Sequence, residues 1–391
     1  MKLVTFSIVL FAAFACQSSR ADPFSWHGYV SQGLTQSVNS NFITDNNDIS
    51  ASLTELGLNG RYRFGASLSL VGQVEYLDGG NRFEQGLRLD YLFLDWRLPQ
   101  IEKWQTHVHV GRFKNRHWLY SATRDVPQTR ATAILPQSVY FDGFRDIALG
   151  SDGVLVQLTR ATTNGNWEVN WSYGKTPLNQ AQTRSFLGGT AMGEADQDFV
   201  HQFSAYWQPQ SMNWRFGASW LQSAFTYHAA PVDNLVDGEV DITRAMLSMI
   251  YFSESWELSA EVIREHQQDT GGYGLNYYNE RTGQGGYVQW RYLFNDKFSG
   301  LLSYDTYVLD KDDPDGTQLM LESGGAIPAY FGYEDTYAVG LRWDIAPNWR
   351  LQAEHHWVDG AGRVTGLLNP RTQATTKEDW RMWALQMMYW F

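Results

Sequence analysis

The sequence predicts an all-β fold, a transmembrane antiparallel β-barrel of about sixteen strands, and three observations support it. Aromatic residues make up 15% of the 391 residues, and glycine occurs 35 times. Beyond the N-terminus, no apolar run reaches the roughly 18 residues that a membrane-spanning helix needs. Short alternating segments recur, with short and long connections in turn. Strands that alternate lipid-facing and lumen-facing side chains produce this composition without a long hydrophobic run.

Four segments show the period of two most clearly, and each begins with tryptophan after a tight turn. They are WEVNWSY, WRFGASW, WELSAEV and WRLQAEH, which start at Trp167, Trp214, Trp256 and Trp349. Within each segment, apolar residues share one face of the expected strand and mostly polar residues share the other. Tryptophan at the same end of successive strands predicts an aromatic girdle at one membrane interface.

The connections between the expected strands alternate in length. Short ones include TTNGN, PQSMN, SES, NDK and APN, and long ones fall near 175–198, 225–240, 267–285, 308–335 and 359–379. Short periplasmic turns and long extracellular loops give a barrel this asymmetry, and an even strand number leaves both termini on the periplasmic side. The sixteen strands are expected near 25–36, 50–63, 68–77, 86–97, 106–111, 153–160, 167–174, 199–208, 214–224, 241–252, 256–266, 286–294, 298–307, 336–345, 349–358 and 380–391.

The N-terminus has the pattern of a secretory signal peptide over residues 1–21. Lys2 is followed by the apolar stretch Leu3 to Cys16, and small residues precede an expected cleavage near Asp22. The barrel is therefore expected over 22–391, without cysteine, which excludes disulfides and thiolate metal sites from that part. Loss of Lys2 and Arg20 lowers the net charge from −12 to −14. So acidic a chain is not expected to bind nucleic acid.

The longest connection, residues 112–152, is the third long loop and carries several apolar residues, including Trp118, Tyr120 and Tyr140. A long apolar connection in a compact fold is expected to pack, here inside the barrel. Its six cations outnumber three anions, and charged groups at a narrow passage select ions. They form an anion-favouring constriction, or they pair with acids and fix the loop to the wall. The six are Arg112, Lys114, Arg116, Arg124, Arg130 and Arg145.

Catalytic and metal-binding patterns are weak. His107 and His109 share one face of a strand, but no carboxylate lies in the same short stretch, so no metal or cofactor is expected. No nucleophile-elbow motif supports a hydrolase. The acidic stretch Asp310 to Gly316 could bind Ca²⁺, although it lacks EF-hand spacing and is interpreted as solvated loop charge. The sequence therefore favours a protein that catalyses no reaction.

The chain ends on MWALQMMYWF, an apolar string with alternating faces. Leu385, Met387, Tyr389 and Phe391 share one face, and Gln386 lies on the other. This pattern predicts a final strand that pairs with the first and closes the barrel, which hides both sheet edges.

The chain resembles the Gram-negative outer-membrane porins. The resemblance rests on the signal peptide, the first strand WHGYVSQGLTQ, the long third loop and the terminal Phe391. The segment GRFKNRHWLYSATRDVPQTRATAILPQSVYFDGFRDIALGSDGV is similar to that of a porin-like group distantly akin to phosphate-selective porins. Asn115 to Trp118 depart from that group's pattern, and no matching ladder of pore arginines is present, so phosphate selectivity is not implied.

This resemblance implies an outer-membrane porin for passive diffusion of small hydrophilic solutes and ions, set in lipid and lipopolysaccharide and often trimeric. Tyr389 and Phe391 would then form the signal read by the barrel-assembly machinery. Three alternatives stay open: a channel specific for a sugar, phosphate or organic acid, with Trp118 and Tyr120 as candidates for a sugar track; an outer-membrane hydrolase; and a plugged barrel acting as a receptor or scaffold.

Overall fold

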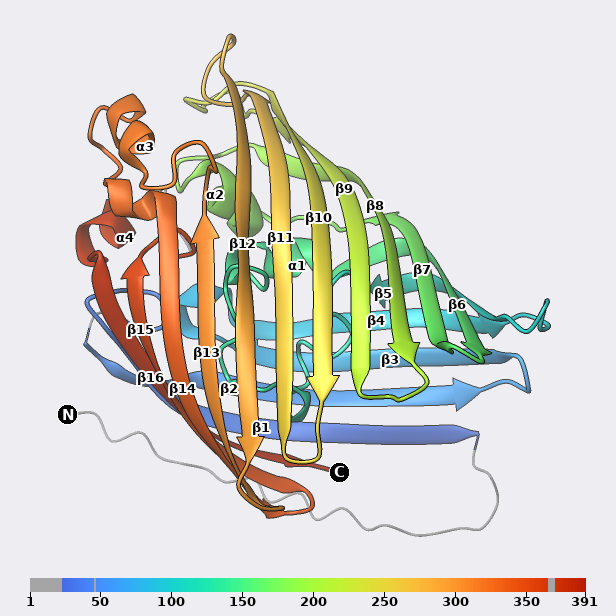
Figure 1. Cartoon of the computed structure of the whole chain (residues 1–391). Helices are drawn as coiled ribbons and strands as arrows, with labels where there is room; N and C mark the ends of the chain where they lie inside the picture. Colours follow the sequence, from blue (N-terminus) through green and yellow to red (C-terminus); the bar gives the residue numbers. More distant parts are fainter. Residues whose placement is uncertain (1–22, 46, 365–369) are drawn as a thin grey trace.

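Sixteen antiparallel strands form a closed barrel in the computed structural model, which describes residues 23–45, 47–364 and 370–391. Each strand pairs with its neighbour in sequence, and β1 pairs with β16 to close the ring (Figure 1). The predicted fold class and strand number are therefore confirmed. The predicted signal peptide, residues 1–21, lies outside the described residues.

The strand bounds are β1 Phe24–Val38, β2 Ile49–Arg63, β3 Leu68–Asp78, β4 Gly86–Arg97, β5 Gln105–Lys114, β6 Gly150–Thr162, β7 Gly165–Lys175, β8 Glu194–Pro209, β9 Trp214–His228, β10 Gly238–Phe252, β11 Trp256–Gly271, β12 Tyr278–Leu293, β13 Phe298–Val308, β14 Tyr333–Ala346, β15 Trp349–Gly360 and β16 Asp379–Trp390. The described parts of the connections contain four short α-helices: α1 Arg145–Ala148, α2 Gln180–Leu187, α3 Thr317–Glu322 and α4 Pro370–Thr375. Among the described residues, no helix is long and apolar enough to cross a bilayer.

Several strands run further toward the long-loop end than the sequence predicts. β8 begins at Glu194 rather than near 199, and β12 begins at Tyr278 rather than near 286. The added part of β12 reads YNERTGQG, which after Tyr278 is polar or glycine on both faces. A strand segment without an apolar face has no period-two hydrophobic signal, so its pairing cannot be seen in the sequence.

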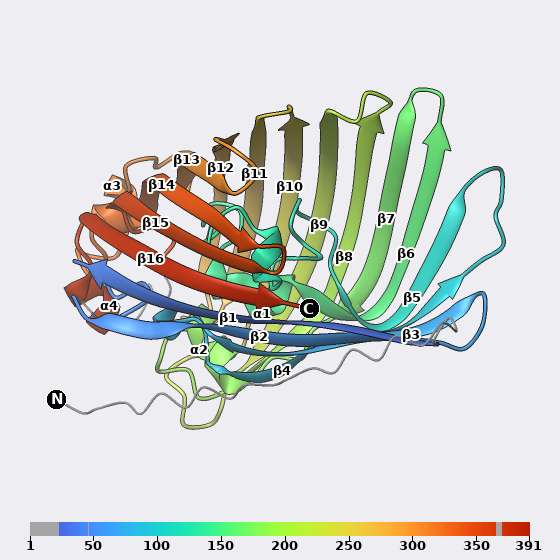
Figure 2. The same ribbon diagram turned by 90° about the horizontal axis from the view of Figure 1, so that it is seen from below.

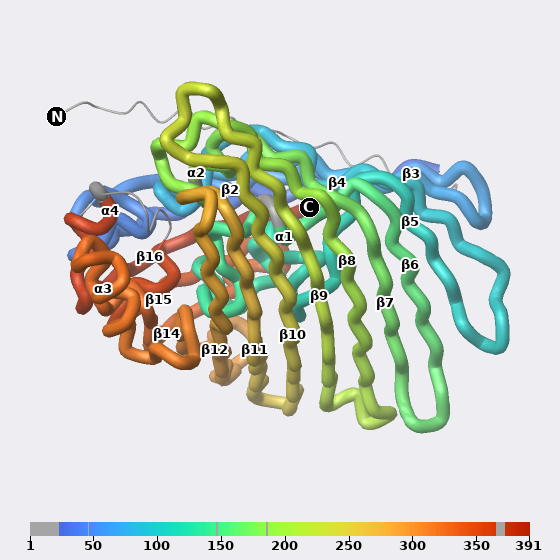
Figure 3. Tube along the Cα trace, turned by 90° about the horizontal axis from the view of Figure 1, so that it is seen from above, coloured from blue at the N-terminus to red at the C-terminus, as the bar shows by residue number. Residues whose placement is uncertain are grey.

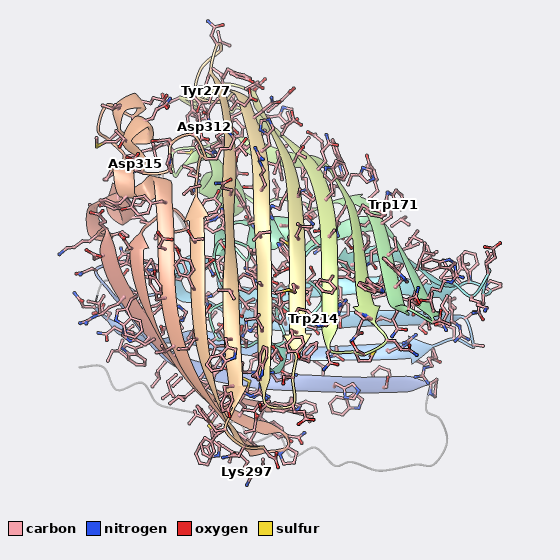
Figure 4. The ribbon with its side chains drawn as sticks, in the orientation of Figure 1. Trp171, Trp214, Tyr277, Lys297, Asp312 and Asp315 are labelled. Carbon is pink, nitrogen blue, oxygen red and sulfur yellow. The ribbon has the colours of Figure 1, made fainter. Side chains whose placement is uncertain are left out.

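The two ends of the barrel differ, as the connection lengths predict. Figure 4 shows Lys297, from the short connection between β12 and β13, at one end, and Tyr277, Asp312 and Asp315 at the other. The start of β1 and the end of β16 lie at the short-connection end, where Gly28 and Phe391 exchange backbone hydrogen bonds of 3.1 and 3.0 Å. By the convention of such barrels, this end is the periplasmic one.

The outer wall is apolar, and aromatic rings gather near the short-connection end. Outward side chains such as Leu247 and Leu341 are largely exposed, whereas their inward neighbours are mostly buried or polar. Around the rim, Trp214 lies 4.4 Å from Tyr251, Tyr251 lies 4.8 Å from Trp256, and Trp349 lies 4.8 Å from Tyr389 (ring centroids). The tryptophans that begin these strands thus lie in the belt that the sequence predicts.

Candidate functional site

The connection between β5 and β6, residues 115–149, is called loop 3 below, and it lies inside the barrel. In the views from below and from above, its helix α1 lies among the strands rather than outside them (Figures 2 and 3). Trp118, Tyr120 and Tyr140 of loop 3 pack against inward residues of β10, β11 and β12, in a buried cluster with Met246, Ile263 and Tyr287. Loop 3 therefore reaches the wall formed by these strands.

Loop 3 also reaches a second part of the wall. Ala133 and Ile134 belong to a second buried cluster with Phe42, Phe331 and Trp380, which come from the connections after β1 and β13 and from β16. The two clusters lie against different strands, and contacts with Glu261 of β11 on one side and Glu75 of β3 on the other show that the segment crosses the lumen. Its apolar residues explain why it packs instead of extending into water.

Three carboxylates of the wall accept hydrogen bonds from the backbone of loop 3. Glu261 of β11 accepts from the N–H of Leu119 at 3.0 Å. Asp305 of β13 accepts from the N–H of Ser138 at 3.2 Å. Glu354 of β15 accepts from the N–H groups of Ala133 and Ile134, both at 2.9 Å, and from His356 on its own strand at 3.0 Å. Hydrogen bonds to ionised acceptors are stronger than neutral ones, so these contacts fix the path of loop 3.

On strands β2, β3 and β4 the wall carboxylates instead pair with cations. Arg130 of loop 3 pairs with Glu55 at 2.5 Å. Arg145, which begins α1, pairs with Glu75 at 3.1 Å and with Asp125 of loop 3 at 2.5 Å. Lys114, the last residue of β5, pairs with both Asp90 and Asp125. All these groups are buried or nearly so.

The centre of this arrangement is a buried charge cluster of Glu75, Asp90, Asp125, Lys114 and Arg145. Ligand atoms of the three carboxylates lie within 4.8 Å of one another, a spacing that a metal could also use. Here the Lys114 ammonium and the Arg145 guanidinium contact these carboxylates instead. Burial raises the pKa of Asp125, but Arg145 and Lys114 outweigh it and hold that pKa well below its ordinary value. Asp125 contacts Lys114 of β5 directly, and Lys114 and Arg145 in turn connect loop 3 to Asp90 of β4 and Glu75 of β3.

The structure places the six predicted constriction cations in three kinds of environment. Lys114, Arg124, Arg130 and Arg145 are buried in ion pairs, Arg124 with Asp142 at 2.8 Å. Lys114, Arg130 and Arg145 have the pairing geometry of the alternative in which the cations fix the loop to the wall, whereas Arg124 and Asp142 pair within loop 3. Arg112 and Lys114 belong to β5, which is longer than expected. Arg112 is paired across the sheet with the outward-facing Leu92 and bonds to Asp152 at 2.7 Å.

Arg116 differs from the other five because it is partly exposed on the lumen side. Its side chain is 29% exposed and lies 3.4 Å from Glu168 of β7. Arg215 of β9, 36% exposed, lies 3.3 Å from the same carboxylate and over the ring of Tyr206. Two cations share one carboxylate here, which leaves a positive charge accessible to water in the lumen.

Some features of the site were not predicted from sequence. The faces of Glu55 and Glu261 follow from strand alternation, but their bonds to loop 3 do not. Tyr29 of β1, which is buried, donates its hydroxyl to the carbonyl of Asp125. Trp118 and Tyr120, the candidates for a sugar track, are buried in the apolar cluster around Met246, where they serve packing.

The structure provides only part of the site that an outer-membrane hydrolase would need. Asp95 lies 2.7 Å from His107, an acid–imidazole pair that a hydrolase could use. The hydroxyl across the strand pair from Asp95 is that of Ser69, and it accepts hydrogen bonds from Arg61 at 3.2 Å rather than contacting an imidazole.

The acidic stretch between β13 and α3 uses its carboxylates to hold its own backbone. Asp313 accepts from the N–H groups of Gln318 at 3.0 Å and Leu319 at 2.9 Å, and Asp315 accepts from Thr317 at 3.1 Å. We expect Asp313→Ala to loosen α3 by about 1 kcal/mol, the usual effect of losing such a cap. Faster proteolytic cleavage within residues 309–332 of the variant would show that α3 is loosened. Unchanged cleavage, or a loss of Ca²⁺ binding, would contradict this structural role.

The apolar outer wall, the closed ring of sixteen strands and the loop across the lumen define a porin-type barrel. Structural comparison agrees at the level of the fold. OmpT of Vibrio cholerae matches with a TM-score of 0.59 and 12% identity, over 95% of this chain and 99% of that chain. The anion-selective porin from Comamonas acidovorans matches with a TM-score of 0.57 and 12% identity, over 94% and 99%. The outer-membrane channel DcaP of Acinetobacter baumannii matches with a TM-score of 0.56 and 12% identity, over 97% and 100%.

No protein-family model matches the sequence, and no curated protein sequence matches it. The likeness at 12% identity therefore concerns the fold.

Proposed function

We propose that the protein is a porin of the Gram-negative outer membrane, through which small hydrophilic solutes and ions diffuse passively. One observation carries the proposal: loop 3 crosses the lumen and is held on both sides by carboxylates of the wall. A rigid segment inside a water-filled barrel narrows the passage and sets the size of solute that passes. The protein needs no cofactor for this and catalyses no reaction.

The proposed ion preference is for anions, and we assign it to Arg116 together with Arg215. Both are partly exposed and share the single carboxylate of Glu168, so their net charge is positive. Charges beside a narrow passage with low-dielectric walls act strongly on passing ions. Lys114, Arg124, Arg130 and Arg145 shape the constriction indirectly, because they hold loop 3 in place.

The remaining parts of the proposal concern location and assembly. Residues 1–21 direct export, and residues 22–391 form the barrel, with loop 3 (residues 115–149 of the predicted segment 112–152) as its constriction loop. The apolar wall contacts lipid, with lipopolysaccharide in the outer leaflet, and Tyr389 and Phe391 are read by the barrel-assembly machinery. A homotrimer is proposed because a protein of similar fold, OmpT of Vibrio cholerae, has a structure described as a trimer form.

Conductance across a planar lipid bilayer tests the proposal. The purified protein is expected to give discrete conductance steps and, in a salt gradient, a reversal potential of the anion-selective sign. The double variant Arg116→Gln, Arg215→Gln should shift that potential toward cation selectivity without abolishing the steps, because it removes lumen charge and leaves the buried ion pairs intact.

Other results would favour other functions. Absence of steps from the correctly folded protein would reject the porin and favour a plugged barrel. Saturable block by a sugar, phosphate or organic acid at micromolar to millimolar concentration would favour a substrate-specific channel. An unchanged reversal potential in the double variant would reject Arg116 and Arg215 as the source of selectivity.

A further inference from the structure

Three side chains that loop 3 does not use meet on the inner wall near the short-connection end: Asp95 of β4, and His107 and His109 of β5. One oxygen of Asp95, Oδ1, lies 2.7 Å from Nδ1 of His107 and 3.4 Å from Nε2 of His109. The three potential ligand atoms all lie within 4.8 Å of one another. Two imidazoles and one carboxylate thus converge on a single point.

The register of the two strands brings these groups together. Asp95 lies directly across from His109, and His107 is two residues further along the same face of β5. Their neighbours Trp96 and Val110 face outward and are about half exposed, so the three side chains face the lumen.

One histidine of the cluster is held in place by a neighbouring ring, and the other is accessible to water. The ring of Phe93 stacks on His109 at 4.3 Å with an interplanar angle of 21°, which fixes the orientation of that imidazole. Asp95 and His109 are buried, whereas the side chain of His107 is 26% exposed. The ligand set is therefore held by its surroundings and can still be reached from water in the lumen.

This donor set suits a divalent transition metal. Zn²⁺ binds imidazole nitrogen and carboxylate oxygen at about 2.0–2.2 Å, so adjacent tetrahedral ligands lie roughly 3.3 Å apart. The His109–Asp95 distance already agrees, and the His107–Asp95 distance needs to widen by about half an ångström. Three protein ligands leave a coordination position for water, as in open metal sites.

The competing interpretation is an ion-pair network without metal. Nη2 of Arg61, on β2, lies 2.9 Å from Oδ2 of Asp95, the oxygen that the histidines do not use. Arg97, across the strand pair from His107, adds a second cation nearby. These cations neutralise Asp95 and repel a metal ion. The two interpretations therefore differ in what they predict for Zn²⁺ binding when Arg61 is removed.

We propose that Asp95, His107 and His109 form a binding site for one divalent transition-metal ion of the Zn²⁺ class, on the lumen wall near the periplasmic end. The metal enters from the aqueous lumen, and a water molecule occupies its remaining coordination position. Arg61 lowers the affinity of the site, because it holds the carboxylate and repels the incoming ion. The proposal concerns binding to the folded barrel and does not depend on whether the barrel conducts ions.

Isothermal titration of Zn²⁺ into the detergent-purified protein, prepared without a histidine tag, tests the proposal. One equivalent of Zn²⁺ is expected to bind. His107→Gln and His109→Gln should each weaken binding at least about tenfold, the lower end of what losing even an outer-shell partner does to a metal site. His228→Gln, which alters an exposed histidine outside the cluster, should leave binding unchanged.

Arg61→Gln distinguishes the two interpretations, because a metal site predicts tighter Zn²⁺ binding in this variant. A Cu²⁺-loaded sample should show coupling to two nitrogens in its electron paramagnetic resonance spectrum, and this coupling should fall to one in His107→Gln. Resistance to heat denaturation in detergent confirms that each variant is folded. The proposal is overturned if the folded wild type binds no Zn²⁺, if both histidine variants bind it normally, or if Arg61→Gln fails to tighten binding.

Discussion

Replacing Lys114 by methionine is expected to destabilise the barrel by about 3–5 kcal/mol and to free loop 3 from the wall, because the change removes one partner from a buried ion pair. Methionine keeps most of the volume of lysine, so the effect comes from the charge. Without Lys114, Asp90 loses the ammonium that it contacts, and Asp125 keeps only Arg145. Three buried carboxylates then face one cation in this cluster.

Two measurements follow the change. The temperature at which the detergent-solubilised barrel loses its β-sheet circular dichroism should fall well below that of the wild type. Single-channel conductance should become larger and spread over several levels, because a loosened loop 3 no longer holds one constriction. These results would link the buried charges to the shape of the pore rather than to its selectivity.

Two further variants make the test specific. Arg112→Met removes a cation from the partly exposed pair with Asp152 and is expected to change stability by at most about 1 kcal/mol. The double variant Lys114→Met, Asp90→Asn should recover much of the loss, since it neutralises the carboxylate whose cation was removed, while Asp125 and Glu75 keep their contacts with Arg145. If Lys114→Met behaved like Arg112→Met, or if the second substitution gave no recovery, the anchoring role of the cluster would be wrong.

The sequence predicts the barrel well because each strand crosses a layer with two different faces. Trp167 and Trp256 mark strand ends, and alternation from these residues assigns the inward and outward faces correctly. That signal fades where both faces are polar, so the sequence misses the outer part of β12. The period of two therefore records contact with an apolar surface rather than backbone pairing itself.

The partners of loop 3 could not be predicted in the same way. The sequence shows six cations near Trp118, but Glu55 and Glu261, which hold parts of loop 3, are distant in the chain. A register shift in the β3–β4 pair between Gln73 and Val74 also leaves Asp90 with no residue directly opposite it in the register, and its side chain turns inward to Lys114. Such a bulge has no clear sequence signature here.

The carboxylate partner of the two histidines could not be predicted from the sequence either. His107 and His109 are recognisable as a pair on one face, and a search along the same stretch finds no acid. The missing carboxylate, Asp95, comes from the preceding strand β4, on the other side of the turn, and only the register places it opposite His109.

Deletion of Phe391 is expected to abolish most assembly of the barrel in the outer membrane while leaving the ion selectivity of the remaining folded protein unchanged. Phe391 closes the β1–β16 seam through two backbone hydrogen bonds to Gly28, and its ring lies 5.4 Å from that of Trp26, at the rim of the barrel. Loop 3 contacts other residues, so the constriction should not change. The amount of heat-resistant barrel in outer-membrane fractions, and reversal potentials of the purified variant, measure the two effects.

A substitution at Gly28 separates recognition of Phe391 from its packing. A side chain at Gly28 would meet the Phe391 ring, since an added Cβ would lie 2.5 Å from its Cζ. Gly28→Ala therefore disturbs the closed seam but keeps the terminal residue that the assembly machinery is proposed to read. If the signal is read before closure, Gly28→Ala should assemble nearly normally and unfold at a lower temperature, and Phe391→Trp should assemble better than the deletion. Equal assembly defects in Gly28→Ala and in the deletion variant would assign Phe391 to packing at the seam alone. Normal assembly of the deletion variant would reject both the recognition role and the packing role, because the barrel would then close without Phe391.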